Sequence, residues 1–331
     1  MSASAAAASR PIDRLVSVGN VVIDLVARVD SLPERGGDVL ASGGRLEPGG
    51  GFNLMVAARR QGLPTAYAGT TGTGPFGDLA RAALAREGID CVHAAVRGVD
   101  TGFDVALVDA DGERTFVTAV GAEAELTVER LDAVEIRPTD ALVISGYSLL
   151  HPANRAAILG RLPSLPAETL VVYDPGPLGH QVSAADLCVL HARIDWWSGN
   201  AREVLLATGE DDPERGAGIL ATLLARARVV VRTGASGCLL ADPSGTAVTV
   251  PGFPVEVLDT NGAGDAHVGV MISALAEGLP PKEALVRANA AAAVAVTREG
   301  PAQAPERDEL ESFLLERRPG GAPAGSPAPT G

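Results

Sequence analysis

The segment at residues 258–267 reads LDTNGAGDAH and separates two different patterns. A run with β-strand character precedes it at residues 248–257, and an apolar, helix-like segment follows at residues 268–275. Unpaired N–H groups at a helix start, together with the positive end of the helix dipole, form an anion site. A carboxylate there repels a bound anion, so Asp265 makes most sense as a proton acceptor. The pattern predicts phosphoryl transfer, with Asp265 as base and the backbone of residues 262–264 as anion hole.

A glycine-rich turn of this kind is also common as a purely structural feature. In that interpretation, Asp265 is an ordinary acid of the first helical turn, which the helix dipole stabilises. The segment by itself leaves both interpretations open, and the remainder of the chain has to distinguish them.

The composition describes a globular protein with an aliphatic core. Of 331 residues, 46% are apolar, 21% are charged and only 3% are aromatic, so Ala, Val and Leu must form most of the core. The net charge of −14 argues against a general nucleic-acid binder or a protein that binds anionic membranes. Lys282 is the single lysine, so almost all positive charge is arginine.

The cysteines and histidines do not have the spacing of metal ligands. The three cysteines lie far apart and are expected to be buried thiols in a reducing compartment. Residues 1–10 lack the basic start and apolar run of a signal peptide, and no apolar run is long enough to span a membrane. We expect a cytoplasmic protein.

The order of predicted elements indicates an α/β fold. Strand-like runs such as residues 141–146, 169–174 and 229–232 alternate with helical segments, which predicts a mostly parallel central sheet with helices on both faces. Residues 21–29 are expected to continue a first strand at residues 14–19.

Two further segments are expected to form a small antiparallel β lid. Residues 101–121 contain two β-like runs around an Asp-Gly turn, and residues 33–48 are glycine-rich with short β-like pieces such as residues 38–42. We expect one domain over residues 11–317, with disordered ends at residues 1–10 and 318–331, the latter rich in Pro and Gly.

Several polar residues fall where predicted strands end or helices begin. Ligands of parallel α/β sheets bind beyond the carboxyl ends of the strands. No glycine-rich turn of the chain has the Lys-Ser/Thr of a Walker A loop, and the first strand–helix turn lacks the dinucleotide fingerprint. The residues expected at this common edge are Asp24, Asn53, Asn200 and Asp265.

Four motifs, in order along the chain, resemble those of the ribokinase-like (PfkB) carbohydrate kinase family. DTNGAGD at residues 259–265 matches the C-terminal signature DTxGAGD at every fixed position, and PGGGFN at residues 48–53 resembles the N-terminal Gly-Gly signature. NARE at residues 200–203 matches the NxxE motif, and TGASG at residues 233–237 resembles the nucleotide-loop segment. The resemblance extends from about residue 14 to residue 317.

The resemblance implies transfer of the γ-phosphate of ATP to a hydroxyl, usually the CH2OH of a sugar or a sugar derivative. Asp265 would be the base, and the backbone of Gly262, Ala263 and Gly264 the anion hole. Glu203 and Asn200 would organise Mg2+ through waters, and Asp259 would begin a loop that binds K+. Residues implied at the nucleotide are Asn200, Thr233, Gly234, Ser236, Gly237 and Asn289; those implied at the sugar are Asp24, Gly49, Gly50 and Asn53. The lids of this family often pair between subunits, which implies a homodimer.

Departures from the ribokinase pattern leave the acceptor open. Val22 stands where ribokinases tend to have Asn, and Gly50 stands where they tend to have Lys. Phe52 adds an apolar group on which the base of a nucleoside could stack. A sugar kinase is the leading hypothesis, and a nucleoside kinase is the alternative within the family. A non-catalytic sugar sensor and a nicotinamide-dependent dehydrogenase are the readings from other classes.

Overall fold

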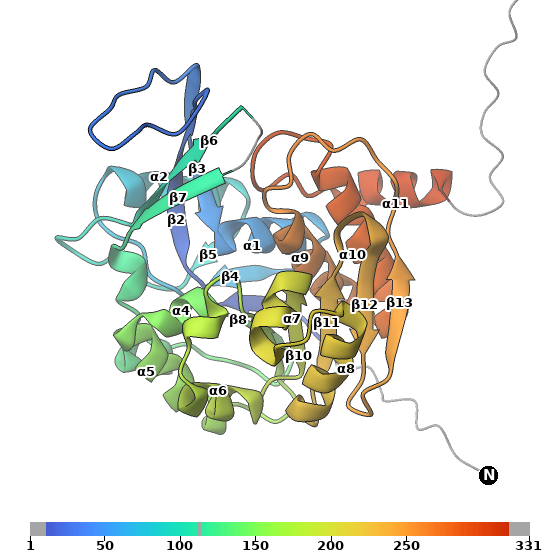
Figure 1. Ribbon diagram of the computed structural model, residues 1–331. Helices are drawn as coiled ribbons and strands as arrows, with labels where there is room; N and C mark the ends of the chain where they lie inside the picture. The colour runs from blue at the N-terminus through green and yellow to red at the C-terminus, as the bar shows by residue number, and fades with distance from the viewer. Residues whose placement is uncertain (1–10, 111–113, 318–331) are drawn as a thin grey trace, which may run out of the picture.

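The computed structural model describes residues 11–110 and 114–317, which form two sheets surrounded by helices (Figure 1). Within these residues, a nine-stranded sheet has the order β13-β12-β11-β10-β9-β8-β1-β4-β5 and is parallel except at β12 and β13. Its strands are β1 (Arg14–Ser17), β4 (Thr65–Tyr67), β5 (Asp90–Cys91), β8 (Asp140–Ser145), β9 (Leu170–Asp174), β10 (Trp196–Asn200), β11 (Arg228–Arg232), β12 (Gly237–Ala241) and β13 (Ala247–Pro251).

Helices cover both faces of this sheet. They are α1 (Gly51–Arg60), α2 (Pro75–Arg86), α3 (Val128–Asp132), α4 (Gly146–Leu150), α5 (Pro152–Arg161), α6 (Ala184–His191), α7 (Ala201–Thr208), α8 (Pro213–Leu224), α9 (Ala263–Ala276), α10 (Pro281–Ala295) and α11 (Arg307–Glu316). Successive residues of a strand pack in different parts of the hydrophobic core. Val16 packs in the cluster that contains α5, α7 and α8, whereas its neighbour Leu15 packs in the cluster that contains α1, α2, α9 and α10. The predicted fold class is therefore confirmed. Helix α11, whose Leu310 packs in one cluster with residues of α9 and α10, was not expected from the sequence.

The second sheet stands above one edge of the first and has the order β3-β2-β6-β7 (Figure 1). We call it the lid. It consists of β2 (Val21–Arg28), β3 (Gly43–Gly50), β6 (Phe103–Val108) and β7 (Arg114–Ala119). Strands β2 and β6 run parallel, and the other two pairs are antiparallel.

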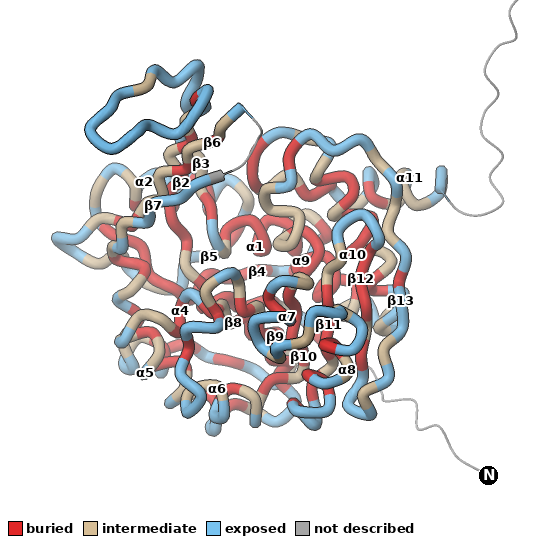
Figure 2. Tube along the Cα trace, in the orientation of Figure 1, coloured by how far each residue is buried: buried red, intermediate tan, exposed pale blue. Residues whose placement is uncertain are grey.

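Two expectations about the strands of this region were wrong. Residues 21–29 do not continue β1, because the chain leaves the main sheet at Gly19 and Asn20 and β2 becomes an inner strand of the lid. Residues 38–42 form no strand; they belong to an exposed loop, pale blue in Figure 2, and the pairing begins only at Gly43. The expected disordered ends, residues 1–10 and 318–331, lie outside the described residues, as do residues 111–113, on which part of the expected Asp-Gly turn falls. In the described part of the chain, no helix is long and apolar enough to cross a membrane.

Candidate active site

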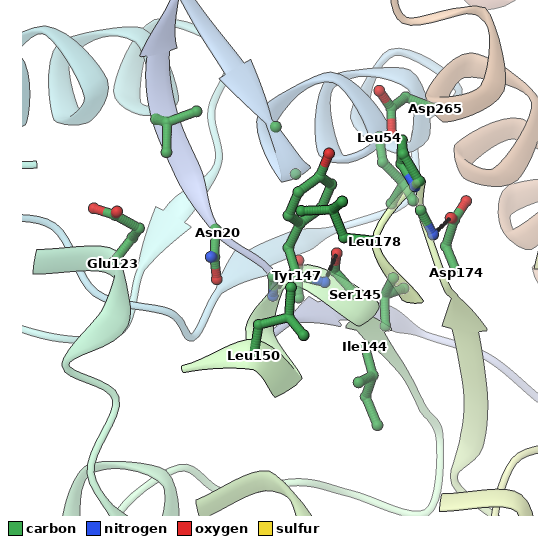
Figure 3. A pocket seen from close by; sticks show the side chains of 18 of the residues that line it. Asn20, Leu54, Glu123, Ile144, Ser145, Tyr147, Leu150, Asp174, Leu178 and Asp265 are labelled. Atoms are coloured by element: carbon green, nitrogen blue, oxygen red, sulfur yellow. Dashed lines mark hydrogen bonds between the residues drawn. The ribbon is translucent and has the colours of Figure 1, made fainter. Parts of the chain in front are cut away.

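A cavity of about 480 Å³ lies between the lid and the carboxyl ends of the main-sheet strands (Figure 3). The strand order brings segments that are far apart in the sequence to this edge: the turn after β1, the ends of β8 and β9, and the start of α9. Each of the four lid strands, β2, β3, β6 and β7, contributes at least one lining residue. The polar lining includes Asn20, Asp104, Thr118, Glu123, Ser145, His151, Asp174, Glu203, Arg232 and Asp265.

Asp265 lies in the first turn of α9, as expected, and lines the cavity. Gly262 precedes the helix with φ +72°, a left-handed conformation that glycine adopts without strain. Asn53 Nδ2 donates a hydrogen bond of 3.2 Å to Asp265 Oδ2. Burial, followed by the nearby Asp174 carboxylate, raises the pKa of Asp265 to about 7. A carboxyl with this pKa changes its protonation state near neutral pH, which suits a general base.

Arg232, like Asp174, Tyr147 and Asp104, lines the cavity and was missed by sequence reasoning. It ends β11 and points into the cavity, where its Nη1 lies 3.1 Å from Asp174 Oδ2 and its Nη2 lies 3.5 Å from Glu203 Oε2. A Cβ added at Gly264 would lie 3.3 Å from Arg232 Nε, so the guanidinium lies directly beside the glycines that precede Asp265. A signal was available, because Arg232 stands immediately before TGASG, at the carboxyl end of a predicted buried strand.

Asn200 and Glu203 form a capping box at the start of α7. The Glu203 backbone N–H donates to Asn200 Oδ1 at 2.9 Å, and Glu203 Oε2 accepts from the Asn200 backbone N–H at 2.7 Å. Burial, and secondly the Asp174 carboxylate, raises the pKa of Glu203. Asn200 therefore caps α7, and this bonding orients Glu203, which lines the cavity.

The carboxylates of Asp174 and Glu203 fit a divalent cation of the Mg2+ type. Mg2+ prefers oxygen ligands, retains several waters and often uses only one or two protein carboxylates. The two acids lie on either side of Arg232 at the edge of one cavity, and each raises the pKa of Asp265. Among the residues described, no group of three acids, His or Cys could enclose a metal alone. The two carboxylates therefore fit a cation whose remaining ligands are waters and an anionic ligand.

The residues implied at the sugar lie close together, although only Gly50 lines the cavity. Gly50 has φ +61°, and an added Cβ would approach Asn20 O to 2.5 Å. At Gly49 an added Cβ would lie 2.5 Å from Asp24 Oδ2, so only glycine leaves room for that carboxylate. Asp24 is buried, and Asn53 contacts Asp265 instead.

The expectation that Phe52 offers a surface for a nucleoside base was wrong. Its side chain is 3% exposed and packs in the core with α9. The aromatic residue of the cavity is Tyr147, at the start of α4, whose ring lies between Glu123 on one side and Asp174 on the other in Figure 3.

The loop expected at the nucleotide follows Arg232 and lies outside the cavity lining. It is a short turn in which the backbone N–H of Thr233 donates to Gly237 O at 2.9 Å, and Gly237 has φ +99°. Gly234 and Ser236 form a single 3-10 turn between them. Asn289 is also outside the lining: its Nδ2 donates to Val250 O and Pro251 O, and its Oδ1 lies 3.1 Å from His267 Nε2. Burial lowers the pKa of His267 to about 3, so the imidazole is neutral.

Asp259 joins the segment before α9 to the segment after α10. Its Oδ1 accepts from the Asn261 N–H at 2.8 Å, and its Oδ2 accepts from the Gly300 N–H at 3.0 Å. The backbone N–H of Asp259 in turn donates to Val296 O at 3.1 Å. These bonds hold the loop that begins at Asp259, which the resemblance implies for K+, against residues 296–300.

Comparison with known proteins agrees with this architecture. The model of the pfkB family carbohydrate kinases matches residues 12–308. The chain is 33% identical over 307 residues to the uncharacterized sugar kinase YegV of Escherichia coli, covering 88% of this chain and 91% of that protein. It is also 33% identical over 307 residues to an ATP-dependent ribose-1-phosphate kinase of Halopiger xanaduensis, covering 92% and 99%. Ribokinase from Thermotoga maritima superposes with a TM-score of 0.78 at 26% identity, covering 92% of this chain and 99% of that one. This protein therefore belongs to the pfkB family of carbohydrate kinases.

Proposed function

We propose that the protein transfers the γ-phosphate of ATP to a primary hydroxyl of a sugar or sugar derivative, with Asp265 as the general base. The observation that carries the proposal is the raised pKa of Asp265, about 7, at a helix start that lines the cavity. A base whose pKa lies near the working pH combines a useful fraction of carboxylate with sufficient basicity. Asn53 fixes the orientation of this carboxyl through its hydrogen bond. Asp265 accepts the proton of the acceptor hydroxyl as that oxygen attacks phosphorus.

The transferred phosphoryl group requires positive charge and hydrogen-bond donors, because catalysis of phosphoryl transfer depends mainly on positioning and electrostatics. The N–H groups of Gly262, Ala263 and Gly264 stand at the start of α9 and supply the anion hole. Arg232, beside Gly264, adds a fixed cation at the same place. Thr233, Gly234, Ser236 and Gly237 follow Arg232 directly in the chain, and with Asn289 they are the residues at which we propose that the nucleotide binds.

Mg2+ would be held at Asp174 and Glu203, with Asn200 orienting Glu203, and it would neutralise charge on the phosphates of ATP. Asp174 Oδ1 already accepts the Gly176 N–H at 2.9 Å, and Asn200 Nδ2 donates to Glu203 Oε1 at 2.9 Å. Both carboxylates are thus fixed before a cation arrives, which limits the reorganisation that binding requires. The bonds of Asp259 to Asn261 and Gly300 support a K+ loop beside the anion hole.

On the acceptor side, Asp24, Gly49 and Gly50 form the junction between the lid and α1, where sugar hydroxyls would bind. A nucleoside kinase is the second candidate, favoured by a specific observation: Tyr147, Leu150 and Leu178 form an apolar wall of the cavity on which a base could lie. A non-catalytic sensor would have no need of Asp265 and Glu203 in this arrangement.

The decisive experiment mixes the purified protein with ATP, Mg2+ and a panel of sugars and nucleosides, and follows ADP release with phosphorus NMR of the products. We expect ADP release that depends on the acceptor and a phosphomonoester on a primary hydroxyl. Turnover with nucleosides alone would replace the sugar kinase by the second candidate. ATP hydrolysis that no acceptor accelerates would contradict the proposal.

A further inference from the structure

A row of acidic side chains crosses the face of the lid that looks toward the cavity. Glu47 on β3 pairs with Asp24 on β2, which pairs with Asp104 on β6, which pairs with Thr118 on β7. Paired residues of neighbouring strands point to the same side of a sheet, and like charges placed opposite one another are unfavourable. Asp104 and Thr118 line the cavity, so the row ends at the acceptor compartment.

Positive charge that could balance this row inside the cavity is scarce. Among the lining residues that the structure describes, Arg232 is the single Arg or Lys, and its guanidinium is held by Asp174 and Glu203 at the phosphoryl end. His151 also lines the cavity, and burial lowers its pKa, which disfavours its charged form. Arg45 balances Glu47 at 2.7 Å but is not part of the lining.

Asp104 is the carboxylate of the lid that remains available to a ligand. Glu123, the other acid at this end, is buried, and its two oxygens accept the N–H groups of Gly102 and Gly121. One oxygen of Asp104 is covered from solvent and accepts no hydrogen bond, while the side chain is bonded to Thr118. A buried acceptor without a donor is costly, and a ligand hydroxyl would supply that donor.

We propose that the acceptor carries no phosphate or carboxylate away from its reacting hydroxyl, and that Asp104 enforces this by accepting a hydroxyl of uncharged acceptors and repelling anionic ones. The inference rests on the proposed kinase function and names the substrate class of the same site. It follows the general rule that specificity is a difference of affinities and often uses a repulsive element. Like charges brought together at a binding site cost enough to weaken kcat/KM by at least about 100-fold.

The test uses acceptor pairs that differ by one phosphate remote from a free primary hydroxyl: ribose and ribose 1-phosphate, and cytidine and cytidine 3′-monophosphate. For each pair, kcat/KM is measured by ADP release, and binding is measured by calorimetry. The wild-type protein should favour the uncharged member by at least about 100-fold. Asp104→Asn should shrink this ratio by at least about 10-fold, and Asp104→Lys should reverse it. Asp38→Asn, which removes an exposed acid of the β2–β3 loop, should leave the ratio unchanged.

The outcomes separate the inference from the function on which it rests. Efficient turnover of the phosphorylated member by the wild-type protein would overturn the inference and leave the kinase function intact. A ratio that Asp104→Asn does not change, at an unchanged melting temperature, would remove Asp104 from the role. Absence of turnover with every acceptor would overturn the kinase proposal, and calorimetry would still show whether the cavity prefers the uncharged member of each pair.

Discussion

Asn53 and Asp265 are 212 positions apart in the sequence, and a hydrogen bond of 3.2 Å joins their side chains at the starts of α1 and α9. This bond requires the two helices to pack closely. Gly269, one turn further along α9, makes that approach, because a Cβ added there would overlap Leu54 O and crowd Ala57 Cβ at 2.8 Å. The geometry of the proposed base therefore depends on a glycine that lies outside the cavity.

Gly269→Ala should separate α9 from α1 and lengthen the Asn53–Asp265 contact. We expect kcat to fall by at least about 10-fold and the melting temperature to drop, because overpacking at a tight helix contact costs roughly 1–3 kcal/mol. Gly160→Ala on α5 is the matched control, since an added Cβ meets nothing within 4 Å. It should raise stability by about 0.5–1 kcal/mol, the usual gain of Ala over Gly in a helix, with unchanged kcat. Equal effects of the two substitutions would contradict this account.

Asp265→Asn should reduce kcat by at least about 100-fold while acceptor binding persists, because general-base catalysis contributes on that scale. In the wild-type protein, kcat/KM should rise with pH and level off above about 7, where the Asp265 carboxyl has lost its proton. Asp174→Asn should move this limb to lower pH, since the Asp174 carboxylate raises the pKa of Asp265. A profile that stays flat from pH 5 to 8 would remove Asp265 from the role of base.

The raised pKa of Asp265 also predicts how the stability of the protein depends on pH. The folded-state pKa of Asp265 is raised from 3.8 to about 7, so the folded protein binds the proton more tightly than the unfolded chain. Stability contributed by this group is therefore complete below about pH 4 and is lost as pH rises through about 7. Asp265→Asn should raise the melting temperature more at pH 8 than at pH 5. An equal increase in melting temperature at both pH values would show that burial does not destabilise the charged form of this carboxyl.

Arg232→Met should weaken both phosphate binding and the proposed base. The substitution leaves Asp174 and Glu203 without their shared cation, and it removes a charge that lowers the pKa of Asp265. We expect a higher KM for ATP, a higher Mg2+ requirement and an acid limb of kcat/KM shifted to higher pH. Arg232→Lys should restore part of the ATP affinity but not the paired contacts, because an ammonium lacks the planar fork of a guanidinium. A pH profile unchanged in both variants would exclude the electrostatic role.

The sequence predicted those parts of the site whose geometry is local. DTNGAGD could be assigned to a helix start because the glycines and the following apolar run are contiguous, and Asn200 with Glu203 forms a capping box within four consecutive residues. Which way a side chain points in the fold, and which distant residues it meets, could not be predicted in this way. Phe52 faces the core rather than the ligand because α1 packs on α9, and Asp104 acquires its acidic neighbours only through the pairing of β6 with β2.

The role of Arg232 could not be predicted from the sequence for the same reason. Its position at the end of a strand was predictable, but its role follows from Asp174 and Glu203, which arrive from β9 and from the start of α7. The order of β9, β10 and β11 in the sheet determines that encounter, and a single sequence carries no direct signal for strand order. The turn at Gly19 and Asn20, where the chain leaves one sheet for another, was missed because runs with β-branched residues stand on both sides of it.

The outer face of the lid gives the final prediction, which concerns assembly. Leu46, Leu25, Val105 and Val117 pair across β3, β2, β6 and β7 and form an apolar row on the face opposite Asp104. Leu46 is 54% exposed and Val117 is 66% exposed, and such contiguous apolar surface is typical of a protein interface. We therefore expect a homodimer through the lid. Val117→Asp should convert it to a monomer in sedimentation experiments and raise the KM for the acceptor, because the lid loses its support. Val248→Asp on β13, where the side chain is 45% exposed and far from the lid, should leave the dimer intact. A wild-type protein that sediments as a monomer at micromolar concentration would refute the expected assembly.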